Sequence, residues 1–148
     1  MKLARILDDN PTLDAYRLNY VSNRYVAPLA QYLGAEYGLV WQEWVILFCL
    51  AQVADLTASD ITDATGRPAN TISDGIGKLL RRRLVSRKRD PSDKRAMILA
   101  LTARGRALYD AMIPRLQETQ ARIFGVLSKP ERRQLERLLG KLVHALHD

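Results

Sequence analysis

The segment 89–105 reads RDPSDKRAMILALTARG, in which a charged, proline-containing stretch is followed directly by an apolar run. The residues from Asp90 to Asp93 are typical of a turn, because aspartate accepts hydrogen bonds from nearby backbone and proline fixes φ. On either side, LVSRKR (84–89) and RAMILALT (95–102) have the composition of short strands. The segment therefore predicts a β-hairpin whose loop covers about residues 90–94.

Two helices are predicted immediately before this hairpin. Thr57 and Asp60 form a variant of the capping box for a short helix that ends at Gly66. A second helix opens at Pro68 and runs to about Arg83. Its buried side is expected to carry Ile72, Ile76, Leu79 and Leu80. A short helix, a tight turn and an amphipathic helix make a helix-turn-helix, and the hairpin that follows makes it a winged helix.

Long helical patterns flank the winged helix on both sides. They run over about 12–33, 41–53 and 102–127, and a last helix begins at the capping box of Ser128 and Glu131. The helix over 41–53 is apolar nearly all round, so we expect it at the centre of the core. The others carry more apolar surface than a winged helix can bury, which favours a second copy of the chain as partner. The expected fold class is mainly α with a small β-hairpin wing.

Charge narrows the class of protein. The 148 residues carry a formal net charge of +7. Residues 67–106 hold twelve Lys or Arg and three acids, a local charge of +9, so the rest of the chain is slightly acidic. A basic block on a near-neutral body is typical of a polyanion-binding protein, and a solvated basic surface is the alternative.

Cysteine content and hydropathy exclude other classes. The single cysteine, Cys49, rules out an internal disulfide and a cysteine-based metal cluster, and it suits a reducing compartment. The N-terminus lacks the apolar core of a signal peptide. The longest apolar run, 44–51, is too short for a bilayer, which takes about 20 residues. We expect a cytoplasmic protein with no membrane partner, metal or cofactor.

The hairpin also carries a family resemblance. Asp93-Lys94-Arg95 at the wing tip, followed by an apolar strand and Leu101-Thr102-Ala103-Arg104-Gly105, resembles the wing of the MarR family of bacterial transcriptional regulators. LLRRRLVSRKRD (79–90) is similar to the family's passage from recognition helix to wing. Asp74, where family members often have a basic residue, departs from the pattern, as do Gly75 and Gly77 in the same helix.

The resemblance implies a homodimer whose terminal helices interlock and whose two winged helices bind a pseudo-palindromic DNA operator. It also implies repression that is relieved by a small ligand or by oxidation. Three parts of the chain are then expected: an N-terminal dimerisation helix over 1–36, a winged helix-turn-helix DNA-binding domain over 37–102, and C-terminal dimerisation helices over 103–148.

The helix from Pro68 is expected to read bases. Asn70 can pair with adenine, Asp74 can accept from cytosine, and Arg67 can contact guanine. For Asp74 the alternatives are solvation, capping or an ion pair with Arg67. The remaining candidates on this face are Ser73 and two phosphate contacts, Thr71 and Lys78.

The wing is expected to make a second DNA contact. Arg95 at the tip of a narrow hairpin can enter the minor groove, where the negative potential attracts arginine. Asp93 is expected to hold the Arg95 guanidinium by a bidentate pair and so fix its direction. Charge for the DNA backbone would come from Arg87, Lys88, Arg89 and Lys94.

An effector site is the remaining expectation. Aromatic side chains, with an arginine to hold a carboxylate, can line an apolar pocket for a phenolic or aromatic acid. The candidates are Tyr16, Arg17, Tyr20, Arg24, Trp41 and Trp44. The alternative for the aromatic residues is a place in the core.

Other functions have less support in the sequence. No pairing of nucleophile and base, no metal-ligand spacing and no phosphate-binding glycine loop is present, so no catalytic residue is assigned and we do not expect an enzyme. Two alternatives to a ligand-released repressor stay open. One is a winged-helix protein-interaction module without DNA binding, and the other is a thiol-based redox regulator that uses Cys49.

Overall fold

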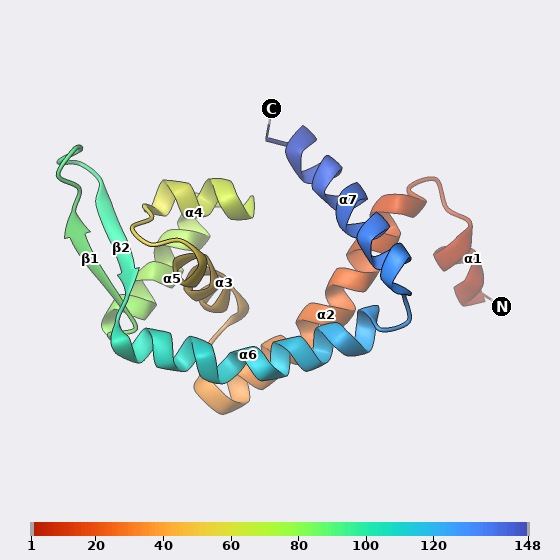
Figure 1. Cartoon of the computed structure of the whole chain (residues 1–148), viewed down its shortest axis with the longest axis horizontal. Coiled ribbons are helices and arrows are strands. Elements are labelled where there is room, and N and C mark those ends of the chain that lie inside the picture. The colour runs from red at the N-terminus through yellow and green to blue at the C-terminus, as the bar shows by residue number, and fades with distance from the viewer. Residues whose placement is uncertain (1, 148) are drawn as a thin grey trace.

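The computed structural model describes residues 2–147, and it confirms a mainly α chain with a small antiparallel hairpin. The elements in chain order are α1 (Lys2–Asp8), α2 (Leu13–Tyr37), α3 (Trp41–Gln52), α4 (Ala58–Thr65), α5 (Ala69–Arg81), β1 (Val85–Arg89), β2 (Met97–Leu101), α6 (Ala103–Phe124) and α7 (Lys129–Ala145). Figure 1 shows α3, α4, α5 and the hairpin gathered at one end. The first half of α2, α1 and α7 lie at the other end, and α6 runs between the two.

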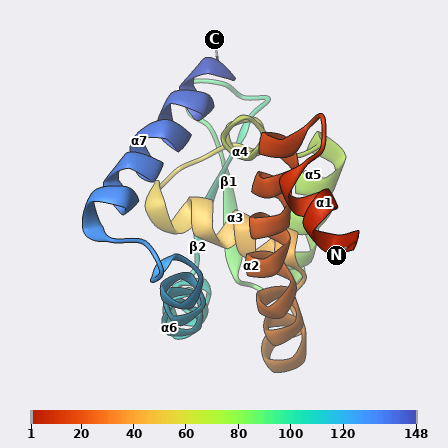
Figure 2. The same ribbon diagram turned by 90° about the vertical axis from the view of Figure 1, so that its right-hand side faces the viewer.

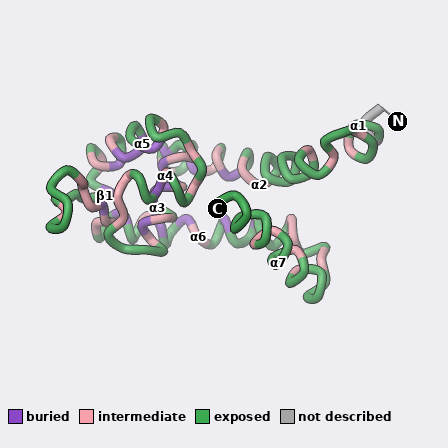
Figure 3. Tube along the Cα trace, turned by 90° about the horizontal axis from the view of Figure 1, so that it is seen from above, coloured by how far each residue is buried: buried purple, intermediate pink, exposed green. Residues whose placement is uncertain are grey.

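The core lies in the winged helix, around α3. Ile46 and Leu47 of α3 have no exposed surface, and neither have Ile61 of α4 and Leu79 of α5. α3 packs against α5, α2 and α6 and so joins the helix-turn-helix to the long helices. Figure 3 shows the buried residues concentrated in this part of the chain. The helix that is apolar all round is therefore central, as its sequence predicts.

The helix-turn-helix follows the predicted capping residues. The Thr57 hydroxyl accepts from the Asp60 N–H at 3.2 Å, and the Asp60 carboxylate accepts from the Thr57 N–H at 2.7 Å. Gly66 ends α4 with φ 63°, the left-handed conformation that glycine adopts without strain. Pro68 precedes the first turn of α5 instead of forming it, because its ψ of 138° is extended and the helix begins at Ala69.

The wing is a short hairpin that is fixed to the start of α6. Val85 pairs with Leu101 and Arg89 with Met97. Leu56, just before α4, adds an isolated bridge to Leu99 that the sequence did not reveal. The Thr102 hydroxyl accepts from the Gly105 N–H at 3.0 Å and caps α6.

Close packing at Gly105 explains why the motif L-T-x-x-G ends in a glycine. A Cβ at Gly105 would collide with the backbone carbonyl of Leu84, which precedes β1. The absence of a side chain therefore lets the first turn of α6 lie directly against the segment that links the end of α5 to the start of the wing.

The long helices differ from their predicted bounds. α2 runs to Tyr37, beyond the expected end near Leu33, and Gly38 ends it with φ 63°. The N-terminal α1 was not predicted. α6 ends at Phe124, before the expected Leu127, and α7 starts after the predicted Ser128 cap. Helix ends are the least certain part of a sequence-based assignment because fraying and tertiary contacts set them.

α7 stands apart from the rest of the single chain. No residue of α7 is buried. Figure 2, turned by 90° from Figure 1, shows α7 on the left and α2 on the right of the molecule. In the described part of the chain, no helix combines the length and the apolar character that crossing a membrane requires.

Candidate nucleic-acid interface

One face of α5 is free for a ligand. Ile72, Ile76 and Leu79 are buried and hold the helix on the core, as predicted, while Leu80, also expected on this side, is half-buried. The residues on the other face are exposed or half-buried, and they are Asn70, Thr71, Ser73, Asp74 and Lys78. Arg67, in the turn before α5, is half-buried. Asp74 forms no ion pair within residues 2–147, so the expected alternative of a pair with Arg67 is not observed.

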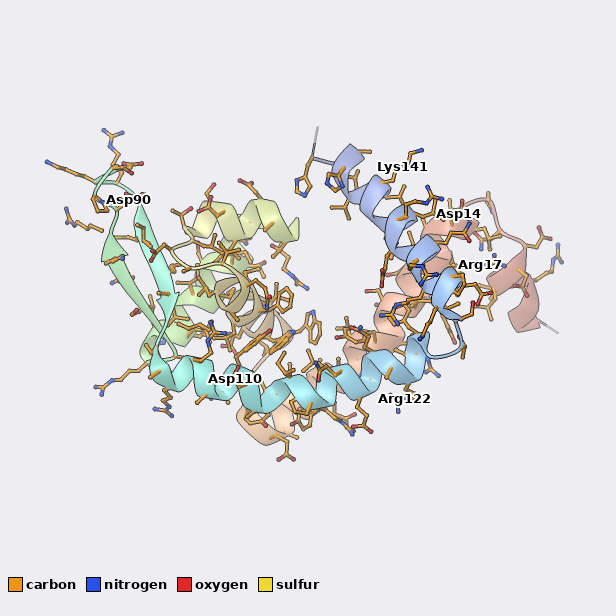
Figure 4. All side chains as sticks on the ribbon, viewed as in Figure 1. Asp14, Arg17, Asp90, Asp110, Arg122 and Lys141 are labelled. Carbon is orange, nitrogen blue, oxygen red and sulfur yellow. The ribbon has the colours of Figure 1, made fainter. Side chains whose placement is uncertain are left out.

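The wing tip is a turn built by two aspartates. The Asp90 carboxylate accepts from the Ser92 N–H at 2.8 Å and from the Ser92 hydroxyl at 2.7 Å, and these hydrogen bonds lower the pKa of Asp90. The Asp90 N–H donates to the Ala96 carbonyl at 3.0 Å and closes the loop. Figure 4 places Asp90 at the far end of the hairpin, away from the helices. The arginine and lysine side chains of the loop are therefore presented to solvent.

The role expected of Asp93 is corrected by the structure. Its carboxylate accepts from the backbone N–H of Arg95 at 2.9 Å, and no ion pair with the Arg95 guanidinium occurs in the described chain. An aspartate two residues before its partner favours this turn, because the side chain and the N–H meet without any further rotation. Asp93 thus shapes the backbone at Arg95 and leaves its guanidinium free.

Strand β1 presents exposed basic side chains. Its only buried residue is Val85, and the other four are exposed, among them Arg87, Lys88 and Arg89. Lys88 lies 3.4 Å from the carboxylate of Asp55, in the loop before α4. Both side chains are exposed, so the pair adds at most about 1 kcal/mol. Sequence reasoning missed Asp55, whose positive φ of 59° is unusual for a residue other than glycine.

α5 and the wing border a common groove of about 440 Å³. Ser73 and Gly77 line it from α5, and Arg87 and Arg95 line it from the wing. The structure therefore brings the predicted base-reading helix and the predicted wing arginines next to each other. Lys94 and Arg89 of the wing are also exposed.

Not every residue of the basic block faces solvent on this side. The Arg82 guanidinium donates to the carbonyls of Tyr37 and Gly38 at the end of α2. Arg106 donates to the Ala51 carbonyl at 3.3 Å and lies over the ring of Tyr109. Net charge along the sequence therefore overstates the charge that this surface presents.

The six effector candidates are spread over two regions. In the first half of α2, Arg17 pairs with Asp8 at 3.0 Å, and the Arg24 guanidinium lies 6.0 Å from the ring centre of Tyr20. Tyr16 is half-buried in the same half of the helix. Arg17 lines the groove that α2 forms with the end of α6 and α7.

The two tryptophans lie on α3. Trp44 is 4% exposed and stacks on Tyr109 with ring centres 5.3 Å apart, while Trp41 meets Tyr25 edge-on at 6.2 Å. Trp44 therefore has the core position that the sequence left as the alternative. Within the single chain these six side chains do not converge on one site.

Two further observations concern redox sensing and metal binding. Burial raises the pKa of the Cys49 thiol, which lowers the fraction of reactive thiolate and disfavours a redox sensor. Among residues 2–147, no group of three or more His, Cys, Asp or Glu side chains is placed to hold a metal ion.

Comparison with known proteins agrees with the geometry. The MarR family model matches residues 37–96. The HTH-type transcriptional repressor Rv2887 of Mycobacterium tuberculosis is 30% identical over 143 residues, which cover 93% of this chain and 96% of Rv2887. The HTH-type transcriptional repressor NicR of Pseudomonas putida is 33% identical over 101 residues, which cover 68% of this chain and 64% of NicR, just under two thirds.

The fold is also found among solved structures. BpsR of Bordetella bronchiseptica, whose DNA binding is regulated by 6-hydroxynicotinic acid, superposes with a TM-score of 0.76 at 29% identity. The match covers 87% of this chain and 97% of BpsR. Proteins of this family are transcription regulators and are generally not enzymes. The chain belongs to the MarR family of winged helix-turn-helix transcriptional regulators.

Proposed function

We propose that this protein is a homodimeric repressor that binds a pseudo-palindromic DNA operator and is released by a small aromatic acid. As a member of the MarR family it is a DNA-binding transcriptional regulator. The observation that carries the proposal is the shared groove, in which the open face of α5 adjoins the arginines of the wing. An α-helix fits the major groove, and a narrow basic hairpin beside it can follow the DNA into the next minor groove.

The base contacts proposed from the sequence are compatible with this arrangement. Asn70 and Asp74 lie on the exposed face of α5 and would contact adenine and cytosine. Arg95 would enter the minor groove. Phosphate contacts would come from Thr71, Lys78, Arg87, Lys88, Arg89 and Lys94, with Arg67 and Ser73 at the edge of the base-reading face.

A twin chain is the proposed occupant of the apolar surface on the terminal helices. A groove of about 740 Å³ between α2, the end of α6 and α7 is lined mainly by leucine, valine and aromatic side chains. Leu138 and Leu142 lie one turn apart on the face of α7 that lines this groove, and they are 43% and 54% exposed in the single chain, which is costly for large aliphatic residues. Dimers are typical of the family. Residues 1–36 and 103–148 would then form the dimer, and 37–102 would read DNA.

The effector is proposed to be an aromatic or phenolic carboxylic acid. BpsR, at 29% identity over most of both chains, responds to 6-hydroxynicotinic acid, which is such a molecule. In a dimer, side chains from the partner can complete a site that one chain leaves open, so the separation of α2 and α3 candidates does not exclude it. A thermal-shift screen of hydroxylated aromatic acids, followed by release of DNA in a band-shift assay, tests this part separately.

Replacing the wing arginine tests the DNA-binding surface. The probe is a duplex that the wild-type protein selects from a random pool. We expect Arg95→Ala to weaken binding of this duplex by about 1–3 kcal/mol. The slope of log affinity against log salt concentration should also become shallower by about one unit, because the variant lacks one positive charge close to the DNA phosphates. Band shifts at several salt concentrations measure both quantities.

Arg122→Ala is the matched control, since it removes the same charge from α6, far from the wing tip in Figure 4. Equal affinity of Arg95→Ala and the wild type would remove the wing from the interface. Selection of no duplex at all by the wild-type protein would instead favour a winged-helix module that binds proteins and not DNA.

A further inference from the structure

Arg82 connects the end of the recognition helix to the end of a dimerisation helix. It follows the last residue of α5, and its Nη2 donates to the Tyr37 carbonyl at 2.7 Å while Nη1 donates to the Gly38 carbonyl at 3.2 Å. These carbonyls belong to the C-terminus of α2. Within residues 2–147, no other side-chain hydrogen bond joins α2 or its cap to α5, and the two helices share few contacts.

The chemistry of this contact favours a fixed geometry. The last carbonyls of a helix lack partners within the helix and carry the negative end of its dipole. A guanidinium satisfies two of them at once with parallel donors in a rigid plane. Because both hydrogen bonds come from one planar group, they restrain the angle between α2 and α5 as well as their separation.

Further contacts link the end of α2 and the segment after α5 to α6. The hydroxyls of Tyr37 and Tyr32 lie 3.2 Å apart, a hydrogen bond that raises the pKa of Tyr32 to about 12, and the Arg115 guanidinium of α6 lies 5.6 Å from the Tyr32 ring centre. The hydroxyl and the N–H of Thr102, before α6, donate to the carbonyls of Arg83 and Leu84, at 2.8 and 3.1 Å. Three consecutive residues after α5 are thus fixed to α2 or to the start of α6.

We propose that Arg82 is a positioning residue that sets the recognition helix relative to the dimerisation helices and thereby determines which half-site spacing the dimer accepts. This inference rests on the proposed operator binding by a homodimer. In such a dimer, the two copies of α5 must lie about 34 Å apart, one turn of duplex, to contact both half-sites. A restraint between α5 and the helices that form the dimer is what holds that separation.

The alternative is that Arg82 contributes only stability or general positive charge. Arg81 provides the comparison, because it precedes Arg82, carries the same charge and is exposed, with no hydrogen bond or ion pair to another element among the described residues. Arg82→Met and Arg81→Met therefore lose equal charge, while only the first loses the two hydrogen bonds to α2. Arg82→Lys keeps the charge but replaces the rigid double donor with a flexible single group.

The test measures spacing discrimination. The probe is a palindromic duplex selected from a random pool by the wild-type protein, together with versions that carry one or two extra base pairs between the half-sites. Each extra base pair rotates one half-site relative to the other by about 35° and moves it by about 3.4 Å. The spacing ratio is the affinity for the selected duplex divided by the affinity for a duplex that carries extra base pairs.

We expect this ratio to fall by between about two- and thirtyfold in Arg82→Met. Arg82→Lys should restore part of it, and Arg81→Met should keep the wild-type ratio even if both methionine variants bind all duplexes more weakly. The inference is overturned if folded Arg82→Met keeps the wild-type ratio. Should Arg82→Met not fold, a wild-type ratio in Arg82→Lys overturns it. Failure of the wild-type protein to select any duplex would instead count against the proposed function.

A second measurement needs no DNA. A protein that carries Cys49→Ala and Ser73→Cys can be spin-labelled at position 73 on α5. Pulsed electron paramagnetic resonance then gives the distance distribution between the two recognition helices of a dimer. The distribution should be narrow in the otherwise wild-type protein, broad in Arg82→Met and narrow in Arg81→Met. A distribution in Arg82→Met as narrow as in the control would show that other contacts fix the helix.

Discussion

At the scale of single residues, two glycines in α5 have different roles although they stand two positions apart. A Cβ at Gly75 would lie 2.6 Å from Cδ1 of Ile46, which is fully buried and cannot move aside into solvent. A Cβ at Gly77 would meet only the mobile end of Arg81, at 3.5 Å. Gly75 is therefore required for the close packing of α5 on α3, and Gly77 is not.

Alanine at these positions should have opposite effects on stability. Gly77→Ala should raise the free energy of unfolding by up to about 1 kcal/mol, because alanine is the better helix former. Gly75→Ala should lower it by about 1 kcal/mol or more, because the extra methyl group overpacks the core. Urea unfolding followed by circular dichroism measures both, and a gain in stability for Gly75→Ala would contradict the packing argument.

Residue identity alone did not decide which atom of a neighbour a side chain contacts. Asp93 and Arg95 were expected to form an ion pair, whereas the carboxylate accepts from the Arg95 N–H. Both contacts suit an aspartate two residues before an arginine, and the turn geometry selects the one to the backbone. Arg82 is a similar case, since nothing in the run of three arginines distinguishes the one that reaches α2.

At the scale of elements, caps and turns explain why the helices begin and end where they do. Asp60 caps α4 through its carboxylate, which accepts from the N–H and the hydroxyl of Thr57. These hydrogen bonds lower its pKa below the ordinary 3.8. A lowered pKa in the folded state means that the ionised form stabilises the fold, so this contribution is present above the unfolded pKa and is lost as the pH falls through the folded pKa.

The pH dependence can be tested by removing this carboxylate. Wild type should be more stable than Asp60→Asn at about pH 6, and the difference should shrink as the pH falls to about 3. Asp63→Asn removes the same charge from the same helix without touching the cap, so its difference from wild type should lack this dependence. Urea unfolding across the pH range measures the stability of both variants relative to wild type. A difference between wild type and Asp60→Asn that widens in acid would contradict the role of this carboxylate in the cap.

At the scale of the whole molecule, the terminal helices are incomplete without a partner. α7 contributes no buried residue to the single chain, although Leu138 and Leu142 are apolar and 43% and 54% exposed. The same leucines line the groove that α7 forms with α2 and the end of α6. The winged helix has its core within one chain, so it should stay folded when the dimer is broken.

A charge in the apolar face of α7 should dissociate the dimer. We expect Leu142→Glu to give a folded monomer, because burying an unpaired carboxylate between two chains costs several kcal/mol (about 3 or more). Operator affinity should fall with it, since only one half-site can then be held at a time. Sedimentation velocity gives the mass, and circular dichroism checks the helix content.

Gln134→Glu adds the same charge to α7 outside the groove and should remain dimeric. A dimeric Leu142→Glu would place the dimer interface elsewhere on the chain.

The sequence by itself determined the order of the elements, the wing and the family. Local hydrogen bonds and periodicity encode these features, and so Thr57, Asp60, Gly66, Thr102 and Ser128 marked helix ends that the structure confirms. Only the tertiary structure decided how the elements meet. The contacts of Gly105 with Leu84, of Arg82 with Tyr37 and of Gly75 with Ile46 join residues far apart in the chain, and no local pattern records them, because they depend on how whole helices pack.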